Sequence, residues 1–419
     1  MNFKNFVASH YPALTSRDFF IFWVGQFISL VGTWMQNTTQ PYLAYRISGR
    51  PLDLGLIGFA GTLPTLFFAL PAGVIIERLD KRKVVIWMQV VEMLQAFVLA
   101  FLALTGLVQI WHIIILAFLF GTASAFEITA RQAMLIELVG REALPNAIAL
   151  QSTIFNLARV LGPSLAAPFM VLLGSQGEGW AFLSNGVSYL FVIVGLFFVR
   201  TPFQTQITEA SKDWIEDFRD GQEYILQNGA ISMIVVMAGV TGFIGFPFLQ
   251  QIPAIAKDLL MHVSDTDIIV AARTSLLYTS QGVGALVASF MIASFNLRRK
   301  GRLLLIGQVA FILGLLGIGL IRDANIAFVL IGVIGWGSVS QLAMMNILIQ
   351  TDVPDNLRGR VFSTYLWALQ GVAPFGSLLI GWMAQNWGLA ATALVAGSLC
   401  LVIIGGLHLF KPELRRREA

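Results

Sequence analysis

Cysteine and charged residues are scarce in this 419-residue chain. Cys400 is the only cysteine, which excludes an intrachain disulfide and a metal cluster held by thiolates. Charged residues make up 12% of the sequence, about half of their share in an ordinary soluble protein. Hydrophobic residues make up 57%. This composition excludes water as the main solvent of the chain.

Motifs for soluble catalysis are also missing. The sequence contains no Gly-x-x-x-x-Gly-Lys-Ser/Thr phosphate loop, no Gly-x-Ser-x-Gly elbow and no His-Glu-x-x-His motif. Gly282-Val-Gly284 begins like a dinucleotide fingerprint but has no third glycine. We therefore expect no enzyme, no ATP hydrolysis, no cofactor and no metal. The polar segment 1–17 has no signal-peptide pattern, so we expect the first apolar block to remain in the mature protein.

Long apolar blocks dominate what is present. A helix rises 1.5 Å per residue, so a block of roughly twenty residues crosses a hydrocarbon core of about 30 Å. We predict an all-α membrane protein with twelve transmembrane helices. The expected spans lie near residues 19–45, 54–76, 84–106, 109–136, 146–173, 179–199, 230–256, 271–295, 303–321, 325–350, 361–386 and 389–410.

The basic residues indicate the orientation of these spans. With the N-terminus in the cytoplasm, the opposite side carries only Arg46, Arg50, Lys257 and Arg322. Nearly all other Lys and Arg then face the cytoplasm, as the positive-inside rule requires. We therefore predict both termini to be cytoplasmic, in a cell inner membrane. The formal net charge of +4 reflects topology, so nucleic acid is not an expected partner.

The two halves of the sequence resemble each other. Pro41 and Pro253 end similar stretches, and Pro163 matches Pro374 at nearly the same spacing. Two parallel repeats of six spans are typical of transporters that enclose a central cavity. We predict two pseudo-symmetric six-helix bundles joined by a cytoplasmic linker. Their limits are residues 1–200, 201–229 and 230–419.

The linker contains an amphipathic pattern. Trp214, Phe218, Gly221 and Ile225 fall on one helical face, while the remaining positions are largely polar. This pattern predicts a helix at the membrane interface that tethers the two bundles.

Four ionisable residues lie within apolar blocks, where charge is expensive: Glu92, Glu127, Arg131 and Arg159. Glu127 and Arg131 share a helical face, and counting from Arg141 places Arg159 at the depth of Glu127, so a Glu127–Arg159 ion pair is possible. In one interpretation, Glu127 or Glu92 takes up and releases protons as its burial and its distance from arginine change. In the other, the charges form a static lock between helices.

Amides and an indole gather before a proline in both halves. Polar candidates for a substrate cavity are Gln26, Trp34, Asn37 and Gln40 before Pro41, and Gln250 and Gln251 before Pro253. Such side chains suit contact with a polar small-molecule substrate, and a proline-weakened helix can bend as gates move. Structural hydrogen bonding between helices is the competing account.

The loop after the second span carries a family signature. It reads Gly73-Val-Ile-Ile-Glu77-Arg78-Leu-Asp80-Lys-Arg82-Lys83, which resembles the major facilitator motif Gly-x-Leu-Ala-Asp-Arg-x-Gly-Arg-Arg/Lys. Glu77 replaces the usual Asp, and Asp80 stands where Gly is commonest. The resemblance implies the major facilitator fold, with this loop latching a cytoplasmic gate. The implied partners are the start of the eleventh span near Val361 and the carboxylate of Glu137.

Further motifs narrow the resemblance. Gly162-Pro163 is similar to a motif of drug/proton antiporters, although later glycines are replaced by alanine. Ser29-Leu-Val-Gly32-Thr-Trp34 and Pro354-Asp355-Asn-Leu-Arg358-Gly359-Arg360 look like the branch of enterobactin-exporter-like and macrolide-efflux-like proteins. This resemblance implies an exporter and does not name its cargo.

The leading hypothesis is proton-coupled efflux of a small organic molecule such as a siderophore, a metabolite or a drug, by alternating access in a monomer. Uptake or lipid flipping by the same fold is a second hypothesis. A membrane channel or a sensor without turnover belongs to a different class. A channel or sensor would tolerate loss of the intramembrane charges, whereas a coupled carrier would not.

Overall fold

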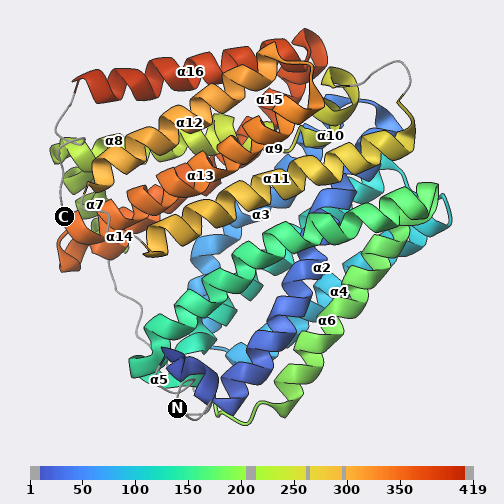
Figure 1. Ribbon diagram of the computed structural model, residues 1–419. Coiled ribbons are helices and arrows are strands. Elements are labelled where there is room, and N and C mark those ends of the chain that lie inside the picture. Colours follow the sequence, from blue (N-terminus) through green and yellow to red (C-terminus); the bar gives the residue numbers. More distant parts are fainter. Residues whose placement is uncertain (1–9, 204–213, 261–264, 295–298, 411–419) are drawn as a thin grey trace. The chain divides into compact units, whose positions relative to one another are not determined.

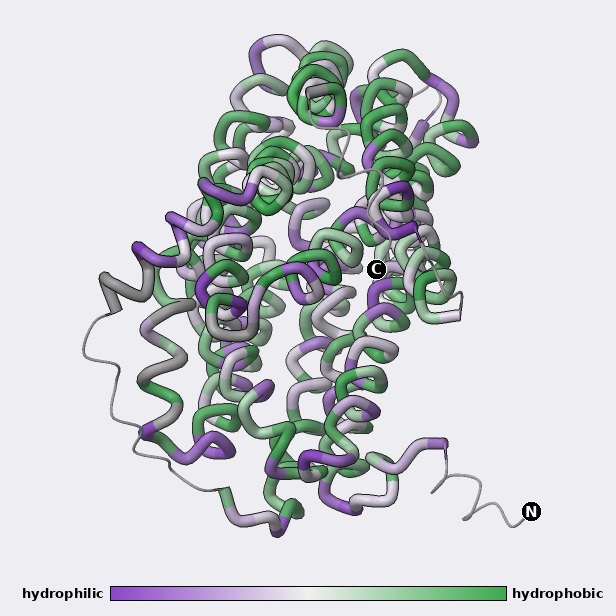
Figure 2. The backbone as a smooth tube through the Cα atoms, turned by 90° about the vertical axis from the view of Figure 1, so that its left-hand side faces the viewer, coloured by the Kyte–Doolittle hydropathy of each residue, from purple (hydrophilic) through white to green (hydrophobic). Residues whose placement is uncertain are grey.

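The computed structural model of the chain describes residues 10–203, 214–260, 265–294 and 299–410. Helices make up nearly all of these residues, and none of them lies in a strand (Figure 1). Figure 2 shows that hydrophobic residues predominate along the helices, with hydrophilic residues at some internal positions. The all-α membrane fold predicted from the sequence is confirmed.

The helices of the N-terminal half are long. They are η1 (Pro12–Thr15), α2 (Arg17–Ser48), α3 (Pro51–Glu77), α4 (Lys81–Leu104), α5 (Ile110–Leu172), η2 (Gly174–Gln176) and α6 (Gly177–Phe198).

The C-terminal half begins after a linker helix and contains several interrupted helices. Its elements are α7 (Trp214–Gln227), α8 (Gly229–Val240), η3 (Thr241–Gly245), α9 (Phe246–Leu249), α10 (Ile252–Ala254), η4 (Ile255–Leu259), α11 (Asp267–Ser294), α12 (Lys300–Leu320), α13 (Ala324–Asp352), α14 (Asp355–Leu366), η5 (Trp367–Gly371), α15 (Ala373–Trp387) and α16 (Leu389–Phe410).

Helix α5 supplies two membrane spans. It has 63 residues, about three times the length that crosses a bilayer, and Gly140 interrupts it with φ 73° and ψ 170°. A positive φ favours glycine, because a Cβ atom would clash with the backbone there. Among the described residues, 11 helical segments are long and apolar enough to cross a membrane. Because α5 counts twice, the described residues contain the twelve predicted spans, with a turn one residue from Arg141.

Contacts divide the chain into two compact units. Unit 1 comprises Met1–Leu43 and Phe67–Ala210, and unit 2 comprises Ala44–Leu66 and Ser211–Ala419. The end of α2 and the first part of α3 therefore group with the C-terminal helices. The predicted division into residues 1–200, 201–229 and 230–419 remains a prediction.

Small residues bring helices together inside unit 1. Helix α4 packs against α5 and α6, and α2 approaches α6 at Gly25 and Gly32. A Cβ atom on Gly32 would lie 2.3 Å from the Ser188 hydroxyl. Close approach through glycine is expected where burial from water does not drive helix association.

Helices of unit 2 deviate from regular α geometry near the predicted cavity residues. Segments η3, η4 and η5 are π-helical, and the seventh span breaks at Gln250 and Gln251. Pro253 has no N–H for the carbonyl of residue 249, and proline also disfavours helical geometry in the residue before it. The expected span 230–256 is thus a helix to Leu249 followed by short separate turns. Such π-helical turns are frequent at functional sites.

The predicted linker helix forms as α7 and packs on α14. Ile225 is buried, and a Cβ atom on Gly221 would lie 2.9 Å from Cβ of Arg360. The side chains of Trp214 and Phe218 lie outside the described residues. The amphipathic face at Gly221 and Ile225 therefore contacts protein, because α14 covers it.

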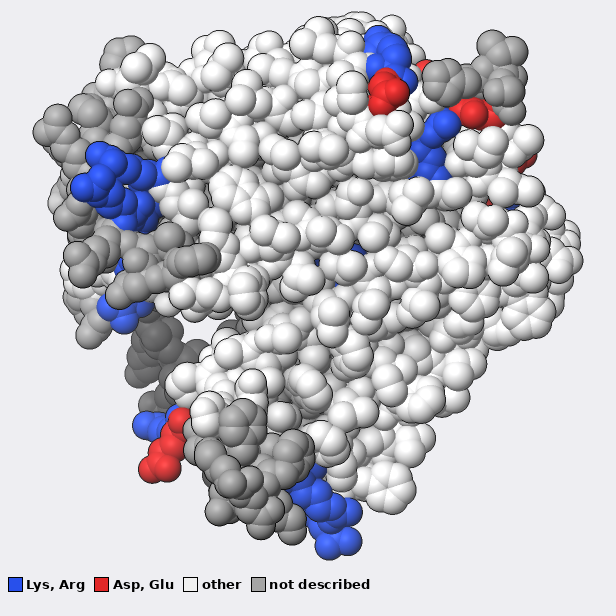
Figure 3. Space-filling model, in the orientation of Figure 1, with Lys and Arg blue, Asp and Glu red and all other residues white. Residues whose placement is uncertain are grey.

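On the outer surface, charged side chains lie near the ends of the helices. On the face in Figure 3, Lys, Arg, Asp and Glu gather near helix ends, and the surface between them is almost entirely uncharged. Large apolar side chains such as Phe101 (61% exposed), Leu313 (58%) and Val402 (70%) are open within the spans. Exposed apolar surface on this scale is suited to lipid.

Candidate functional site

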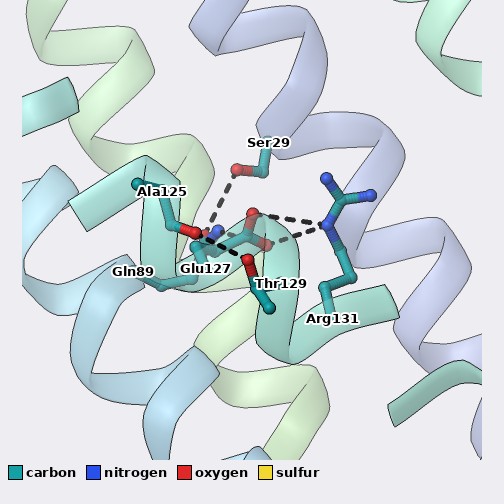
Figure 4. Close-up of polar contacts among 6 residues, drawn as sticks. All are labelled: Ser29, Gln89, Ala125, Glu127, Thr129 and Arg131. Atoms are coloured by element: carbon teal, nitrogen blue, oxygen red, sulfur yellow. Dashed lines mark hydrogen bonds and ion pairs between the residues drawn. The ribbon is translucent and has the colours of Figure 1, made fainter. Parts of the chain in front are cut away.

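A carboxylate and a guanidinium meet inside unit 1. Arg131 Nε donates to both oxygens of Glu127, at 3.0 Å to Oε1 and 3.3 Å to Oε2 (Figure 4). The two residues are four apart on α5 and therefore share a face. Glu127 is only 4% exposed. Charge-assisted bonds of this kind are short and strong, and here they neutralise a buried carboxylate within the membrane span.

Two neighbouring helices contribute to this pair. Gln89 on α4 donates to Glu127 Oε1 at 3.4 Å, and Ser29 on α2 donates to Gln89 Oε1 at 3.4 Å (Figure 4). The carboxylate is thus linked to α4 and α2 through one amide. Hydrogen bonds therefore connect the Glu127 carboxylate to α4 directly and to α2 through Gln89.

Glu92 lies one helical turn beyond Gln89 on α4 and is 4% exposed. Its carboxyl makes no hydrogen bond within the part of the chain that the structure describes, and it interacts electrostatically with Glu127 and Arg131. One guanidinium, Arg131, therefore pairs with Glu127 and also acts electrostatically on the second buried carboxyl group, Glu92. Their combined charge is balanced when one of the two acids carries a proton.

Arg159 does not pair with Glu127. Its guanidinium carbon lies 5.3 Å from the centroid of the Trp34 ring, and Arg131 occupies the carboxylate of Glu127 instead. Counting residues from Arg141 gave a similar depth for Glu127 and Arg159. Equal depth in the membrane does not mean that two side chains point toward each other. Successive side chains on a helix differ in direction by about 100°. The predicted Glu127–Arg159 ion pair is therefore wrong.

Aromatic rings and a glycine shape the surroundings of Arg159. Phe155 packs edge-on against Trp34, with ring centroids 5.5 Å apart and an interplanar angle of 76°. A Cβ atom on Gly162 would lie 2.4 Å from Cβ of Trp34, so α5 touches α2 here. Pro163 follows within the same helix. Gly162 thus serves the close packing that presents Trp34 to Arg159.

The cation–π contact does not offset the burial of this charge. A guanidinium over an indole gains about 0.5–2 kcal/mol. A charge at the centre of a bilayer costs about 2.5–3.5 kcal/mol on insertion scales. Arg159 Nε is buried with no hydrogen-bond partner in the described residues. Arg159 therefore remains a partly compensated cation in the membrane interior.

The other predicted cavity residues on α2 differ in their surroundings. Gln40 accepts from Gln36 at 3.1 Å, and Gln36 also contacts Gln95 and Asn185 on α4 and α6. This buried network supports the structural account for Gln40. Gln26 is 2% exposed, and its Oε1 finds no donor among the described residues. Asn37 is exposed, one turn from Trp34.

A small pocket of about 160 Å³ lies beside Gln250 within unit 2. Thr62 and Thr65 of α3 line it, together with Gln370 of η5 and Ser377 of α15. Gln251 turns away from this pocket and donates to the carbonyl of Pro51 at 3.3 Å. Consecutive residues project in different directions, so only one of the two predicted amides reaches the pocket.

Sequence reasoning missed Gln370, Thr62 and Thr65. Gln370 was detectable as an amide inside an apolar block shortly before Pro374, which repeats the pattern of Gln40 before Pro41. The two threonines gave no such signal, because threonine is common in membrane helices, where its hydroxyl can bond a preceding carbonyl. Thr62 makes such a bond, to the carbonyl of Gly58 at 2.7 Å.

The first signature loop is organised by Asp80. Its side chain caps the N-terminus of α4 by accepting from the Lys83 N–H at 3.3 Å. A capping carboxylate satisfies an orphan backbone donor, which explains an acid where the family usually has glycine. Gly73 lies inside α3, and the side chain of Glu77 lies outside the described residues. Arg78 is exposed, and Arg82 is partly exposed.

Glu137 has a different partner from the one that the resemblance implied. Its carboxylate forms an ion pair with Lys81 at the start of α4, whereas Arg78 points to solvent. Both side chains are mostly buried, at 10% exposure for Lys81 and 19% for Glu137. The pair ties the start of α4 to α5 near the turn at Gly140.

The second signature segment contacts the linker helix. Arg360 Nη1 lies 2.7 Å from Asp220 Oδ2 on α7, and Arg358 donates to the carbonyl of Val353 at 3.4 Å. The side chain of Asp355 lies outside the described residues. The basic residues of this segment therefore connect α14 to α7 and to the end of α13.

Comparisons with known proteins agree over nearly the whole chain. The family model described as transmembrane secretion effector matches residues 8–419. The chain is 24% identical over 390 residues to the multidrug efflux pump Tap of Mycolicibacterium fortuitum, covering 90% of this chain and 91% of that protein. It is 26% identical over 401 residues to the enterobactin exporter EntS of Citrobacter koseri, covering 94% and 91%.

Solved structures give the fold independently. A POT family transporter in complex with a thioalcohol-conjugated peptide superposes with a TM-score of 0.75 at 12% identity. The match covers 96% of this chain and 97% of the transporter. The fold, the matched family and the twelve spans agree, and the chain belongs to the transmembrane secretion effector family of major facilitator transporters.

Proposed function

We propose that this protein exports a small organic molecule in exchange for protons, by alternating access. The observation that carries the proposal is the ion pair of the buried Glu127 with Arg131, beside a second buried acid, Glu92, that interacts electrostatically with both. Export is supported by relatives named as a drug efflux pump and an enterobactin exporter.

Proton exchange follows from the charge balance of this group. When both acids are ionised, the group carries one negative charge in excess, which is costly in a span. Protonation of one acid removes that excess. A transporter that exposes the group to opposite sides of the membrane in turn would carry a proton with each cycle.

Glu127 is the proposed coupling residue, because hydrogen bonds connect its carboxylate to side chains on three helices. Its bonds reach Arg131 on α5, Gln89 on α4 and, through Gln89, Ser29 on α2. Protonation weakens the bonds from Arg131 and Gln89 together. The helices then lose a shared acceptor, which supplies a physical link between proton binding and helix movement.

We also propose the cellular setting. The basic residues favour a cell inner membrane with both termini in the cytoplasm. The two pseudo-symmetric halves supply both sides of a transport path, so a monomer suffices.

The test starts by identifying the cargo. Cells with and without the protein are compared by mass spectrometry for compounds that accumulate inside and disappear from the medium. The compound is then followed in inside-out vesicles under an imposed pH gradient. Glu127→Gln should lower gradient-driven flux by about tenfold or more, while exchange without a gradient stays within about twofold of the parent.

The matched control is Glu142→Gln. Glu142 is an exposed acid on the same helix, near the turn at Gly140, and makes none of the contacts described for Glu127. This variant should transport like the parent. Gradient-driven flux at the parent rate in Glu127→Gln, with the protein correctly folded, would refute the coupling role.

A further inference from the structure

Three arginines lie within membrane spans, and one of them lacks an acid. Arg131 pairs with Glu127, and Arg273 lies 2.7 Å from Asp265 and also donates to a backbone carbonyl. Arg159 forms no ion pair with any described residue; its guanidinium lies over the Trp34 ring instead. The described residues thus neutralise two of these cations and supply no counter-ion to the third.

The position of Arg159 prevents it from reaching water at a membrane surface. Arg159 lies near the middle of the segment between Gly140 and Leu172, and Trp34 lies near the middle of α2. An arginine at a helix end can extend its side chain to the interface, but one at mid-span cannot. The charge is therefore held in the interior.

The aromatic contact leaves hydrogen-bonding capacity unused. Trp34 offers its ring to the guanidinium, and a ring face attracts the charge without replacing a planar acceptor. Arg159 Nε has no acceptor among the described residues. A guanidinium carries five donors in a fixed plane, which matches the two oxygens of a carboxylate.

Part of the surface of this group is exposed. Arg159 and Trp34 are both partly exposed, and Asn37 on the next turn of α2 is exposed on the same side of the helix as Trp34. An acceptor that approaches Arg159 therefore meets an indole ring and an amide nearby. Charge, ring and amide together form a recognition site for a flat, acidic organic molecule.

We infer that Arg159 and Trp34 bind the acidic group of the transported compound, so that the cargo is an organic anion bearing a carboxylate. This inference rests on the proposed transport function and assigns its substrate class. The cargo supplies the counter-ion that the chain does not provide. Neutral and cationic molecules of the same shape leave the guanidinium uncompensated and bind less tightly.

Three fluorescent probes with one ring system test this inference. Dansylglycine carries a carboxylate, dansylamide is neutral and dansylcadaverine carries an amine. Binding of each probe is titrated against the purified full-length protein in nanodiscs. Dansylglycine should bind the parent about tenfold more tightly than the other two, as expected for one charge-assisted hydrogen-bonded pair.

Substitutions then assign the preference to Arg159. Arg159→Met should lower the affinity for dansylglycine by about tenfold and leave dansylamide within about twofold. Arg159→Lys keeps the charge without the planar fork and should fall between the two. Arg322→Met is the control for arginine loss, because Arg322 is exposed just after the end of α12. It should bind all probes like the parent.

Each outcome decides the matter. Retained binding of dansylamide shows that Arg159→Met is folded, and Arg159→Lys provides a second variant if it is not. Equal binding of the three probes, a preference for dansylcadaverine, no binding of dansylglycine, or an unchanged anion preference in both Arg159 variants would overturn the inference. These binding measurements need no proton gradient, so failure of proton coupling at Glu127 would leave their result unaffected.

Discussion

Some single residues in this chain allow close packing of helices, and others place a charge within the membrane. Gly162 belongs to the first kind, because a side chain there meets Cβ of Trp34 at 2.4 Å and the backbone N of Met35 at 2.7 Å. A backbone atom cannot move aside as the end of a flexible side chain can. The resemblance to antiporters drew attention to Gly162, and the structure gives it a definite contact.

Gly162→Ala should therefore destabilise the protein by about 1–3 kcal/mol, because the added methyl group separates α5 from α2. Thermal unfolding in detergent, followed by intrinsic fluorescence, measures the effect. Gly359→Ala is the matched control: Gly359 lies in α14, and an added Cβ meets no atom within 4 Å. That variant should be neutral or slightly stabilised. Equal melting temperatures for the two variants would contradict the packing role of Gly162.

The residues that carry charge were only partly predictable. The sequence placed Glu127 and Arg131 on one face, because a spacing of four fixes both depth and direction on a single helix. It did not identify Trp34 as the partner of Arg159, because that contact joins two helices whose rotation about their axes is set by packing. For the same reason it did not separate Gln250, which lines a pocket, from Gln251, which bonds the backbone.

At the scale of the element, the spans and their ends were predictable, and their irregularities were not. Runs of apolar residues and the turn at Gly140 follow from composition and from glycine's access to positive φ. The π-helical segments η3, η4 and η5 have no comparable local signal. They arise where hydrogen bonds shift register to fit neighbouring helices, which a linear pattern does not record.

The π-helical segment η4 contacts the end of α2, which belongs to the N-terminal half of the sequence. The Tyr45 hydroxyl donates to Asp258 in η4, and Lys257 Nζ lies 5.9 Å from the centroid of the Tyr45 ring. Gln251 donates to the carbonyl of Pro51. The segment from Ala44 to Leu66 is thus fastened to the C-terminal helices within unit 2.

Tyr45→Phe should lower the free energy of local opening of this segment by about 1 kcal/mol. The substitution removes one hydrogen bond to a carboxylate and keeps the ring. Hydrogen exchange of the peptides that cover residues 44–50 should become faster, by about fivefold. Tyr278→Phe is the control, since the Tyr278 hydroxyl has no hydrogen-bond partner in the described part of the chain. Unchanged exchange in Tyr45→Phe would show that the hydroxyl does not hold the segment.

At the scale of the whole molecule, the family, the twelve spans and the proposed chemistry all concern charged groups held within the membrane. The chain belongs to a family of transporters, and its spans in unit 1 hold two buried acids and two partly exposed arginines. Ionisable residues are costly within a membrane span, so those that occur there usually have a function. The proposed use is to carry protons inward as cargo moves outward, with Glu127 as the coupling acid and Arg159 as the contact for an anionic cargo.

The most direct measurement is the sign of the proton movement that cargo alone produces. Proteoliposomes are loaded with the identified compound and with a trapped pH-sensitive dye, in buffer free of the compound, with the membrane potential clamped by potassium and valinomycin. As the compound leaves down its own gradient, exchange for protons should acidify the lumen, and Glu127→Gln should abolish the change. A lumen that stays at constant pH during efflux, or becomes alkaline, would contradict proton exchange.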